Sequence, residues 1–292
     1  MNSRRSFLRN SGFLALTIPL AKIGLAATGA PVGITAFGIQ LYMVRDEMEK
    51  DPLGTLKQLG QMGYTQIESY GGSKGMFWGM SNTEFKKVAS GYGLKLISTH
   101  YNDDDGISFD KKAELAAEID MKYLICPWKG PQKSIDDFKS IADDFNKRGE
   151  ICKKHGIRFG YHPHDYPYKK VDGQLPIDVL LQNTDSGLVD YEMDFYYTVN
   201  ERQDPEAYLK KYKNRFRLCH MRDVLKNHLP PDSKDESACD LGKGVINYPR
   251  LLTVAINNGM EYFFVEQSRY YQETQLQSAE VNAAYMKHLR LV

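Results

Sequence analysis

The chain has no excess of charge of either sign. Its 292 residues include 38 lysines and arginines and 37 aspartates and glutamates, for a formal net charge of +1. A protein that binds the phosphate backbone of a nucleic acid needs an excess of positive charge, so DNA and RNA are not expected partners. The four cysteines form no C-x-x-C pair, which disfavours a zinc ribbon or a thioredoxin-like site and favours buried or idle thiols.

The first 30 residues differ in composition from the rest. The string S-R-R-S-F-L-R contains Arg4 and Arg5, and the mostly apolar stretch 12–27 that follows has Lys22 as its one charged residue. This order resembles a twin-arginine signal peptide and implies export to the periplasm with cleavage near Ala30. An amphipathic first helix of the domain is the alternative. The stretch is too short and interrupted for a stable membrane span, so we expect residues 31–292 to form the mature domain.

Eight short β-rich apolar runs follow, and most of them begin about 30 residues apart. They cover residues 34–41, 64–68, 94–99, 123–126, 157–161, 188–194, 216–220 and 262–266. Segments with helical periodicity lie between many of them, at 52–62, 83–92, 111–119, 135–155, 205–212 and 248–258. No G-x-G-x-x-G follows the first run, as a dinucleotide fold would require. The pattern predicts an α/β fold, a single (β/α)8 TIM barrel.

The interval between the last two runs is longer than the others. Its polar stretch 226–240 is predicted to be a loop insertion over a site. The G-K-G string at 242–244 that follows is expected to be a turn before a helix, since isolated glycines mark turns more often than phosphate sites.

Chemistry in such a barrel lies at the carboxyl ends of the strands. The ends predicted here carry Gln40, Glu68, His100, Trp128, His162, His164, Asp194, His220, Glu266 and Gln267. One histidine at a strand end is usually a hydrogen-bonded structural residue. Imidazoles and carboxylates that converge from several strands are what a divalent ion with nitrogen and oxygen ligands requires, so the joint pattern predicts a metal site.

From residue 31 onward, the chain resembles the sugar phosphate isomerase/epimerase superfamily of xylose isomerase-like barrels. The resemblance rests on G-I-Q-L-Y at 38–42, G-Y at 63–64, I-E at 67–68, I-S-T-H at 97–100, G-Y-H-P-H-D at 160–165, E-M-D at 192–194, H-M-R-D at 220–223, L-G-K-G at 241–244 and V-E-Q at 265–267. Each string is short, and their order and spacing make the resemblance specific.

The resemblance implies one divalent metal ion, which could be manganese, zinc, magnesium or cobalt. Its implied ligands are Asp194, His220 and Glu266, with His162 where many members have a glutamate. A similar histidine-rich string occurs in members that eliminate or add water on keto-inositols and in relatives that act on 3-keto-glycosides. Two further departures are Y-P-Y at 166–168, where Glu-Phe is usual, and Arg222, where lysine is usual.

The implied activity is isomerase or epimerase chemistry on a keto-sugar through an enediolate. Elimination or hydration on a 3-keto-glycoside or keto-inositol shares the first proton abstraction and is the alternative. The candidate acids and bases are Glu266, His162, His164 and His100. The candidate substrate contacts are Gln40, Tyr42, Glu68, Trp128, Arg222 and Gln267, and Tyr161 could also stack on a sugar ring.

Other function classes stay open at this point. A glycoside hydrolase would use Asp194 and Glu266, but its mechanism does not need the interleaved histidines. A non-catalytic sugar-binding module and an apurinic-site endonuclease are more distant, the latter because it would need a basic face. A small carbohydrate is the expected partner, and a homo-oligomer is possible.

Overall fold

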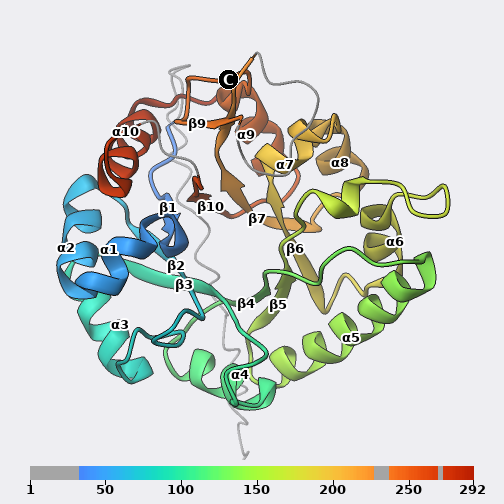
Figure 1. The fold of residues 1–292 in the computed structure, drawn as a ribbon, viewed down its shortest axis with the longest axis horizontal. Coiled ribbons are helices and arrows are strands. Elements are labelled where there is room, and N and C mark those ends of the chain that lie inside the picture. Colours follow the sequence, from blue (N-terminus) through green and yellow to red (C-terminus); the bar gives the residue numbers. More distant parts are fainter. Residues whose placement is uncertain (1–32, 227–236, 269–271) are drawn as a thin grey trace, which may run out of the picture.

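The chain folds as a closed barrel of parallel strands surrounded by helices (Figure 1). The computed structural model describes residues 33–226, 237–268 and 272–292. Around the barrel the strands follow the order β1-β10-β7-β6-β5-β4-β3-β2. They are β1 (Gly38–Gln40), β2 (Gln66–Tyr70), β3 (Lys95–His100), β4 (Tyr123–Cys126), β5 (Arg158–Tyr161), β6 (Val189–Asp194), β7 (Phe216–Met221) and β10 (Tyr262–Val265). The predicted (β/α)8 barrel is confirmed, with one strand at each predicted run.

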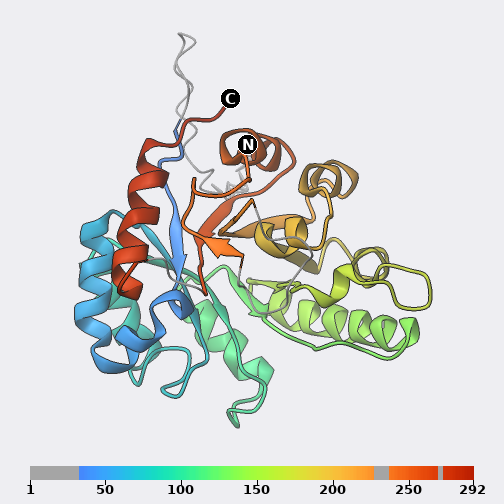
Figure 2. The same cartoon turned by 45° about the horizontal axis from the view of Figure 1, so that its top comes forward.

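Helices follow the strands and cover the outside of the barrel (Figure 2). The α-helices are α1 (Arg45–Lys50), α2 (Pro52–Met62), α3 (Asn82–Gly91), α4 (Phe109–Glu118), α5 (Ile135–Lys154), α6 (Pro176–Asn183), α7 (Phe195–Asn200), α8 (Pro205–Lys211), α9 (Tyr248–Asn257) and α10 (Gln275–His288). Short 3-10 helices are η1 (Leu41–Val44) and η2 (Tyr166–Tyr168). Local sequence fixes several of these ends. Ser134 and Asp137 form a capping box at the start of α5, and Gly63, at φ 95°, ends α2.

The stretch predicted as a loop at 226–240 contains a strand at its end. Ala238–Cys239 (β9) pairs antiparallel with Asp223–Val224 (β8), so the prediction is wrong for these two residues. Residues 227–236 of that stretch lie outside the described residues. The turn predicted at 242–244 is present, and the backbone N–H groups of Gly242 and Gly244 donate to Asp223 at 3.1 and 3.0 Å.

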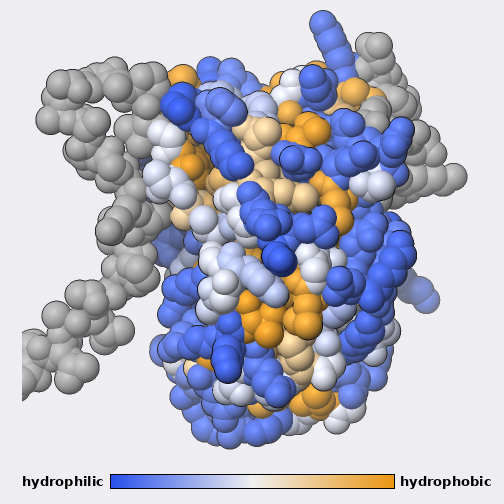
Figure 3. Space-filling model, turned by 90° about the vertical axis from the view of Figure 1, so that its left-hand side faces the viewer, coloured by the Kyte–Doolittle hydropathy of each residue, from blue (hydrophilic) through white to orange (hydrophobic). Residues whose placement is uncertain are grey.

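The core has two parts. The larger one lies between the strands and the helices. The smaller one consists of strand residues on inward positions, which fill the barrel interior: Ile97, Tyr123, Ile125, Leu218 and Phe264. Over one side of the molecule, hydrophilic residues surround smaller apolar patches (Figure 3). Among the described residues, no helix has both the length and the apolar character needed to cross a membrane.

Candidate active site

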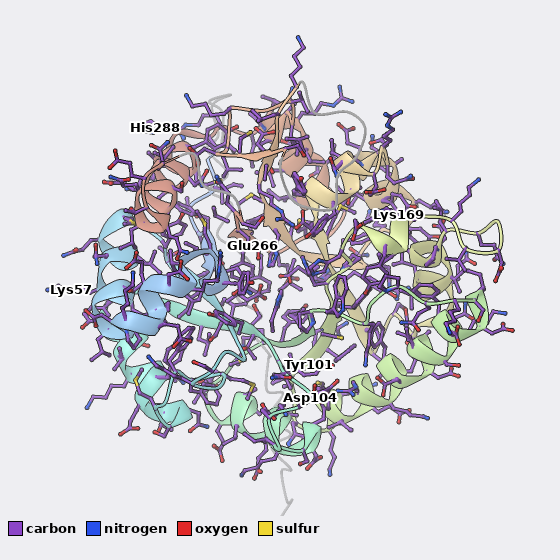
Figure 4. All side chains as sticks on the ribbon, viewed as in Figure 1. Lys57, Tyr101, Asp104, Lys169, Glu266 and His288 are labelled. Atoms are coloured by element: carbon purple, nitrogen blue, oxygen red, sulfur yellow. The ribbon has the colours of Figure 1, made fainter. Side chains whose placement is uncertain are left out.

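A cavity of about 510 Å³ lies at the carboxyl ends of the strands. Its lining comprises Tyr42, Arg45, Tyr70, Gly71, His100, Tyr101, Asn102, Pro127, Trp128, His162, His164, Tyr197, Arg222, Glu266 and Ser268. All four residues predicted as acids or bases are in this set. Figure 4 shows Glu266 near the barrel axis. The cavity therefore contains the four side chains that the sequence predicts as acids or bases.

Three of the six predicted substrate contacts line this cavity. The side chains of Tyr42 and Trp128 are exposed at its rim, with exposed fractions of 44% and 51%. Arg222 is buried and lines the cavity wall. The two exposed rings are available to pack against a sugar, as predicted for them.

The other three predicted contacts are buried, and none is among the described residues that line the cavity. The side-chain amide of Gln40 donates to Glu68 at 2.9 Å, and that of Asn282 donates to Gln267 at 2.9 Å. In this structure Gln40 and Glu68 therefore contact each other, and Gln267 contacts Asn282 on α10 (Gln275–His288), rather than the cavity. Tyr161 is buried as well and packs on Phe145, with ring centroids 4.9 Å apart, so the suggestion that it stacks on a sugar finds no support.

Two overlapping groups of side chains could hold a metal ion, and His220 belongs to both. One group is Asp194, His220 and Glu266, and the other is His100, His162, Glu192 and His220; within each group the ligand atoms all lie within 4.8 Å of one another. The first group contains three of the four predicted ligands. The fourth, His162, lies beside it, with its ring centroid 4.4 Å from that of His220.

Two carboxylates from opposite sides of the barrel hold the central imidazoles. Glu68 Oε1 lies 2.7 Å from His220 Nε2 and 3.2 Å from His100 Nε2, and Ser98 donates to the other oxygen of Glu68. Glu192 Oε2 lies 2.8 Å from His100 Nε2 and 3.3 Å from His220 Nε2. These contacts fix the ring planes of two histidines at the base of the cavity.

The same contacts shift the pKa values of these groups in opposite directions. Burial alone would raise the pKa of Glu68, but His100 and His220 outweigh it and hold that pKa well below its usual range. Burial and the negative charge of Glu68 raise the pKa of Glu192 to about 7. Burial lowers the pKa of His162 well below its usual value, and the neighbouring His220 adds to this effect. Burial therefore favours the neutral form of the His162 imidazole.

Unpaired polar atoms indicate that the buried cluster is built for a ligand. His162 Nδ1 and Glu192 Oε1 are buried and have no hydrogen-bond partner among the described residues. Buried polar atoms are nearly always hydrogen-bonded, so each exception calls for an explanation such as an ion. Both atoms belong to residues of one of the two groups around His220. The donor set of imidazole nitrogen and carboxylate oxygen fits a divalent transition metal.

Arg222 connects one of the candidate metal ligands, Asp194, to the cavity wall. It donates to one oxygen of Asp194 from Nε at 3.1 Å and from Nη2 at 2.7 Å, and its Nη1 donates to Ser268 at 2.8 Å. Its guanidinium carbon lies 4.5 and 4.3 Å from the ring centroids of Tyr196 and Tyr197. A lysine ammonium could not reproduce this planar, doubly stacked arrangement, so the arginine at this position has a structural consequence.

The sequence indicates that Glu192 points inward, but Glu192 was not among the predicted ligands, acids, bases or substrate contacts. The signal for it was its place two residues before Asp194 on β6, because alternate strand residues point to the same side. Arg45, Tyr70 and Tyr197 were also missed. Arg45 and Tyr197 lie on α1 and α7, helices of six residues that are too short for a periodic pattern, and Tyr70 ends β2 two residues beyond the predicted run. These residues complete the cavity wall.

Comparison with known proteins places the chain among barrels of one family. Residues 56–289 match the family model of the xylose isomerase-like TIM barrel. A sugar phosphate isomerase/epimerase from Parabacteroides distasonis is 27% identical, with a TM-score of 0.72, over 92% of this chain and 97% of that one. The structure of the IOLI protein with a bound zinc atom has a TM-score of 0.66 at 15% identity, over 86% of this chain and 96% of that one. The latter likeness concerns the fold alone.

The curated relatives share a shorter part of the chain. An inosose dehydratase from Clostridium perfringens is 29% identical over 116 residues, which are 39% of this chain and 38% of the relative. This chain thus matches well under half the length of that relative. The relatives have names of enzymes, in agreement with the expectation that this chain is an enzyme.

Proposed function

Because this chain belongs to the xylose isomerase-like TIM barrel family, we propose that it is a metal-dependent lyase of the dehydratase type that acts on a cyclic keto-sugar or keto-polyol. One observation is the main support. Four groups able to transfer protons, on His100, His162, His164 and Glu266, face a single cavity whose base is the buried donor cluster around His220. Elimination needs both a base and an acid at one substrate, and His100 and His164 remain for these two roles when Glu266 and His162 hold a metal ion.

The buried cluster would hold the metal ion. Asp194, His220 and Glu266 are its proposed ligands, and His162 is the fourth. A divalent ion there would supply Lewis acidity toward the keto oxygen of the substrate. The pair formed by Arg222 and Asp194 fixes one carboxylate oxygen and leaves the other, Oδ1, with the backbone N–H of Tyr197 at 3.1 Å.

The proposed elimination conserves atoms and charge. A base of the site takes the proton from the carbon next to the carbonyl, the C–O bond one carbon further on breaks, and the departing oxygen receives a proton. The products are an unsaturated ketone and water, or an alcohol when the departing group is an aglycone. His100 is one member of the proposed acid/base pair, because it lines the cavity and its contacts of 2.8 Å to Glu192 and 3.2 Å to Glu68 orient its ring. His164, which lines the same cavity, is the other member of the pair.

Isomerisation or epimerisation is the second candidate, because the Parabacteroides distasonis structure has that name and the two chains share 27% identity along nearly their whole lengths. Against it, the strand-5 position where family epimerases use a second glutamate is His162 here. A glycoside hydrolase is disfavoured further by the structure. Asp194 is fully buried, paired with Arg222 and not among the described residues that line the cavity.

One experiment separates the two candidates. The full chain loaded with manganese is incubated in deuterated water with an inosose, a free ketose and methyl 3-keto-glucopyranoside, and proton NMR follows each substrate. The proposal expects loss of water or methanol and a new vinylic signal. Incorporation of deuterium without any loss would support isomerase or epimerase activity and overturn the lyase proposal.

A matched pair of variants links the reaction to the site. His100→Gln removes one member of the proposed acid/base pair, whereas His155→Gln changes an imidazole that contacts Asp110 on the outside of the barrel. Turnover should fall only for the first. Equal turnover of both variants would remove His100 from the mechanism.

A further inference from the structure

A second cavity of about 450 Å³ adjoins the first and extends away from the barrel axis. Its lining comprises Trp128, Pro131, Gln132, Phe138, His164, Asp165, Tyr166, Lys169, Val171 and Tyr197. Trp128, His164 and Tyr197 line both cavities. Figure 4 shows Lys169 well outward of Glu266, on the side of α6 and α7. Each cavity falls in the range of about 300–1,000 Å³ typical of small-molecule sites, so a single monosaccharide would leave one of them empty.

A row of aromatic rings runs from one cavity into the other. The His162 ring centroid lies 4.8 Å from that of His164, and the His164 centroid lies 4.8 Å from that of Trp128. Trp128 in turn packs edge-on against Tyr166, at 4.8 Å. The half-exposed indole of Trp128 therefore lies between His164, one of the acid/base groups, and Tyr166, in the wall of the second cavity.

Contacts between two loops stabilise the second cavity. One loop, residues 127–134, follows β4, and the other, residues 162–175, follows β5. Tyr166 accepts a hydrogen bond from the backbone N–H of Lys129 and shares another with Tyr161, at 3.1 and 2.7 Å. Further along, the backbone N–H of Ile135 donates to Asp172 at 3.2 Å. Tyr166 belongs to the Y-P-Y string that departs from the usual Glu-Phe of the family, so this departure builds the cavity wall.

The chemistry of the wall suits a ring that carries hydroxyl groups. Apolar surface comes from Trp128, Pro131 and Val171. Polar groups come from Gln132 and from the ion pair of Lys169 with Asp165 at 2.6 Å. Aromatic faces beside polar side chains are what a pyranose needs, because its axial hydrogens are apolar and its hydroxyls form hydrogen bonds.

We propose that the second cavity is a subsite for a second sugar ring, and that the substrate is a keto-disaccharide or a similar glycoside rather than a free monosaccharide. The keto ring occupies the first cavity, and the bond between the two rings lies beside Trp128 and His164. This inference rests on the proposed function only for the identity of the ring that reacts; the subsite itself can be tested by binding.

The first test compares two substrates. The manganese-loaded full chain is assayed with methyl 3-keto-glucopyranoside and with 3-keto-trehalose. The disaccharide should have a kcat/KM at least about 10-fold higher, which corresponds to about 1.4 kcal/mol. Val171→Phe, which narrows the second cavity, should abolish this preference and leave the methyl glycoside unchanged. Leu53→Phe is the matched control, because Leu53 is exposed on α2.

The second test measures binding without turnover. The chain has two tryptophans, and Trp78 is buried while Trp128 is half-exposed. Unoxidised trehalose should quench the fluorescence of the protein, and the quenching should disappear in Trp128→Phe. In Val171→Phe, the affinity for trehalose measured by quenching should fall at least about 10-fold. Methyl glucoside should produce a smaller change that Val171→Phe does not affect.

The outcomes separate the two proposals. If both keto substrates react with equal kcat/KM and Val171→Phe changes neither, the subsite is refuted and the proposed function stands. If neither substrate reacts but trehalose quenches Trp128 in a manner sensitive to Val171→Phe, the subsite is supported and the proposed function fails. Absence of both turnover and binding overturns both.

Discussion

Arg222 directs two nitrogens at a single oxygen of Asp194, and both side chains are buried. Removing one partner of a buried ion pair leaves an uncompensated charge, which costs about 3–5 kcal/mol. Arg222→Ala should therefore lower the free energy of unfolding by about that amount. Arg222→Lys should cost less, because it retains the charge but not the planar fork. Urea denaturation followed by circular dichroism measures both.

An exposed ion pair provides the control for this prediction. Arg250 pairs with Glu206 on the surface, at 2.7 Å, and exposed pairs contribute little to stability. Arg250→Ala should leave the denaturation midpoint almost unchanged. A midpoint for Arg222→Ala as high as that of Arg250→Ala would show that the buried pair does not stabilise the fold.

The metal should depend on the group formed by Asp194, His220 and Glu266. Asp194→Asn and Glu266→Gln each remove one anionic ligand, so both variants should lose most of the bound ion. Metal content after purification without chelator, measured by inductively coupled plasma mass spectrometry, tests this. The unsubstituted protein should hold about one divalent ion per chain, and its content is the reference for the variants.

The overlapping group with His100 and Glu192 gives the opposite expectation. Glu192→Gln should keep the ion and reduce turnover at least about 10-fold, because His100 loses the carboxylate that orients its ring. If Glu192→Gln is instead the variant without metal, the ion belongs to the group of His100, His162, Glu192 and His220, and the assignment of ligands must change.

The barrel and the face of the site could be predicted because both follow from periodicity. Apolar runs about 30 residues apart determine the strands, and chain direction determines which strand ends meet. Whether a given strand-end side chain reaches the cavity or is buried below it could not be predicted. Gln40 and Gln267 are at strand ends like His100, yet each is buried under other side chains. Register shifts beside Glu68 and Glu192 contribute to this, since such irregularities re-aim side chains and leave no mark in the sequence.

Some helices could not be predicted for a different reason. The buried face of α10 includes Ser278, Ala279, Asn282 and Ala283, which form no apolar stripe at helical spacing. The helices α1 and α7 have six residues each, too few for a periodic pattern. Yet α7 presents Tyr197 to both cavities. Packing against the barrel, rather than intrinsic pattern, determines these segments.

The amino-terminal string should direct export. Residues 1–32 lie outside the described residues, so the test is cellular. Replacing Arg4 and Arg5 by lysine should leave the protein in the cytoplasm, while the unsubstituted chain should appear in the periplasm with a new amino terminus near Ala30. Fractionation and amino-terminal sequencing decide between them. A mature chain that begins at Met1 in the cytoplasm would contradict the periplasmic assignment.

The four thiols should be unreactive in the native protein. Cys126, Cys152, Cys219 and Cys239 are free and buried, and burial raises the pKa of each, to about 12 for Cys239. Because the thiolate is the reactive form, the disulfide reagent DTNB should label no thiol at pH 8 before unfolding and all four in guanidinium. Rapid labelling of a native thiol would show that the fold opens near it.

The chemistry should depend on a neutral imidazole at residue 162. His162 Nδ1 lies 3.6 Å from Glu192 Oε2, so His162→Glu would bring a second carboxylate against Glu192 and add one negative charge beside the ion. More anionic ligation weakens the Lewis acidity of a metal. The variant should therefore retain metal and lose at least about 10-fold in turnover, about 1.4 kcal/mol of transition-state stabilisation. His162→Gln, which adds no charge, separates repulsion from loss of the ring. Full activity of His162→Glu, together with turnover of free ketoses, would favour the epimerase instead.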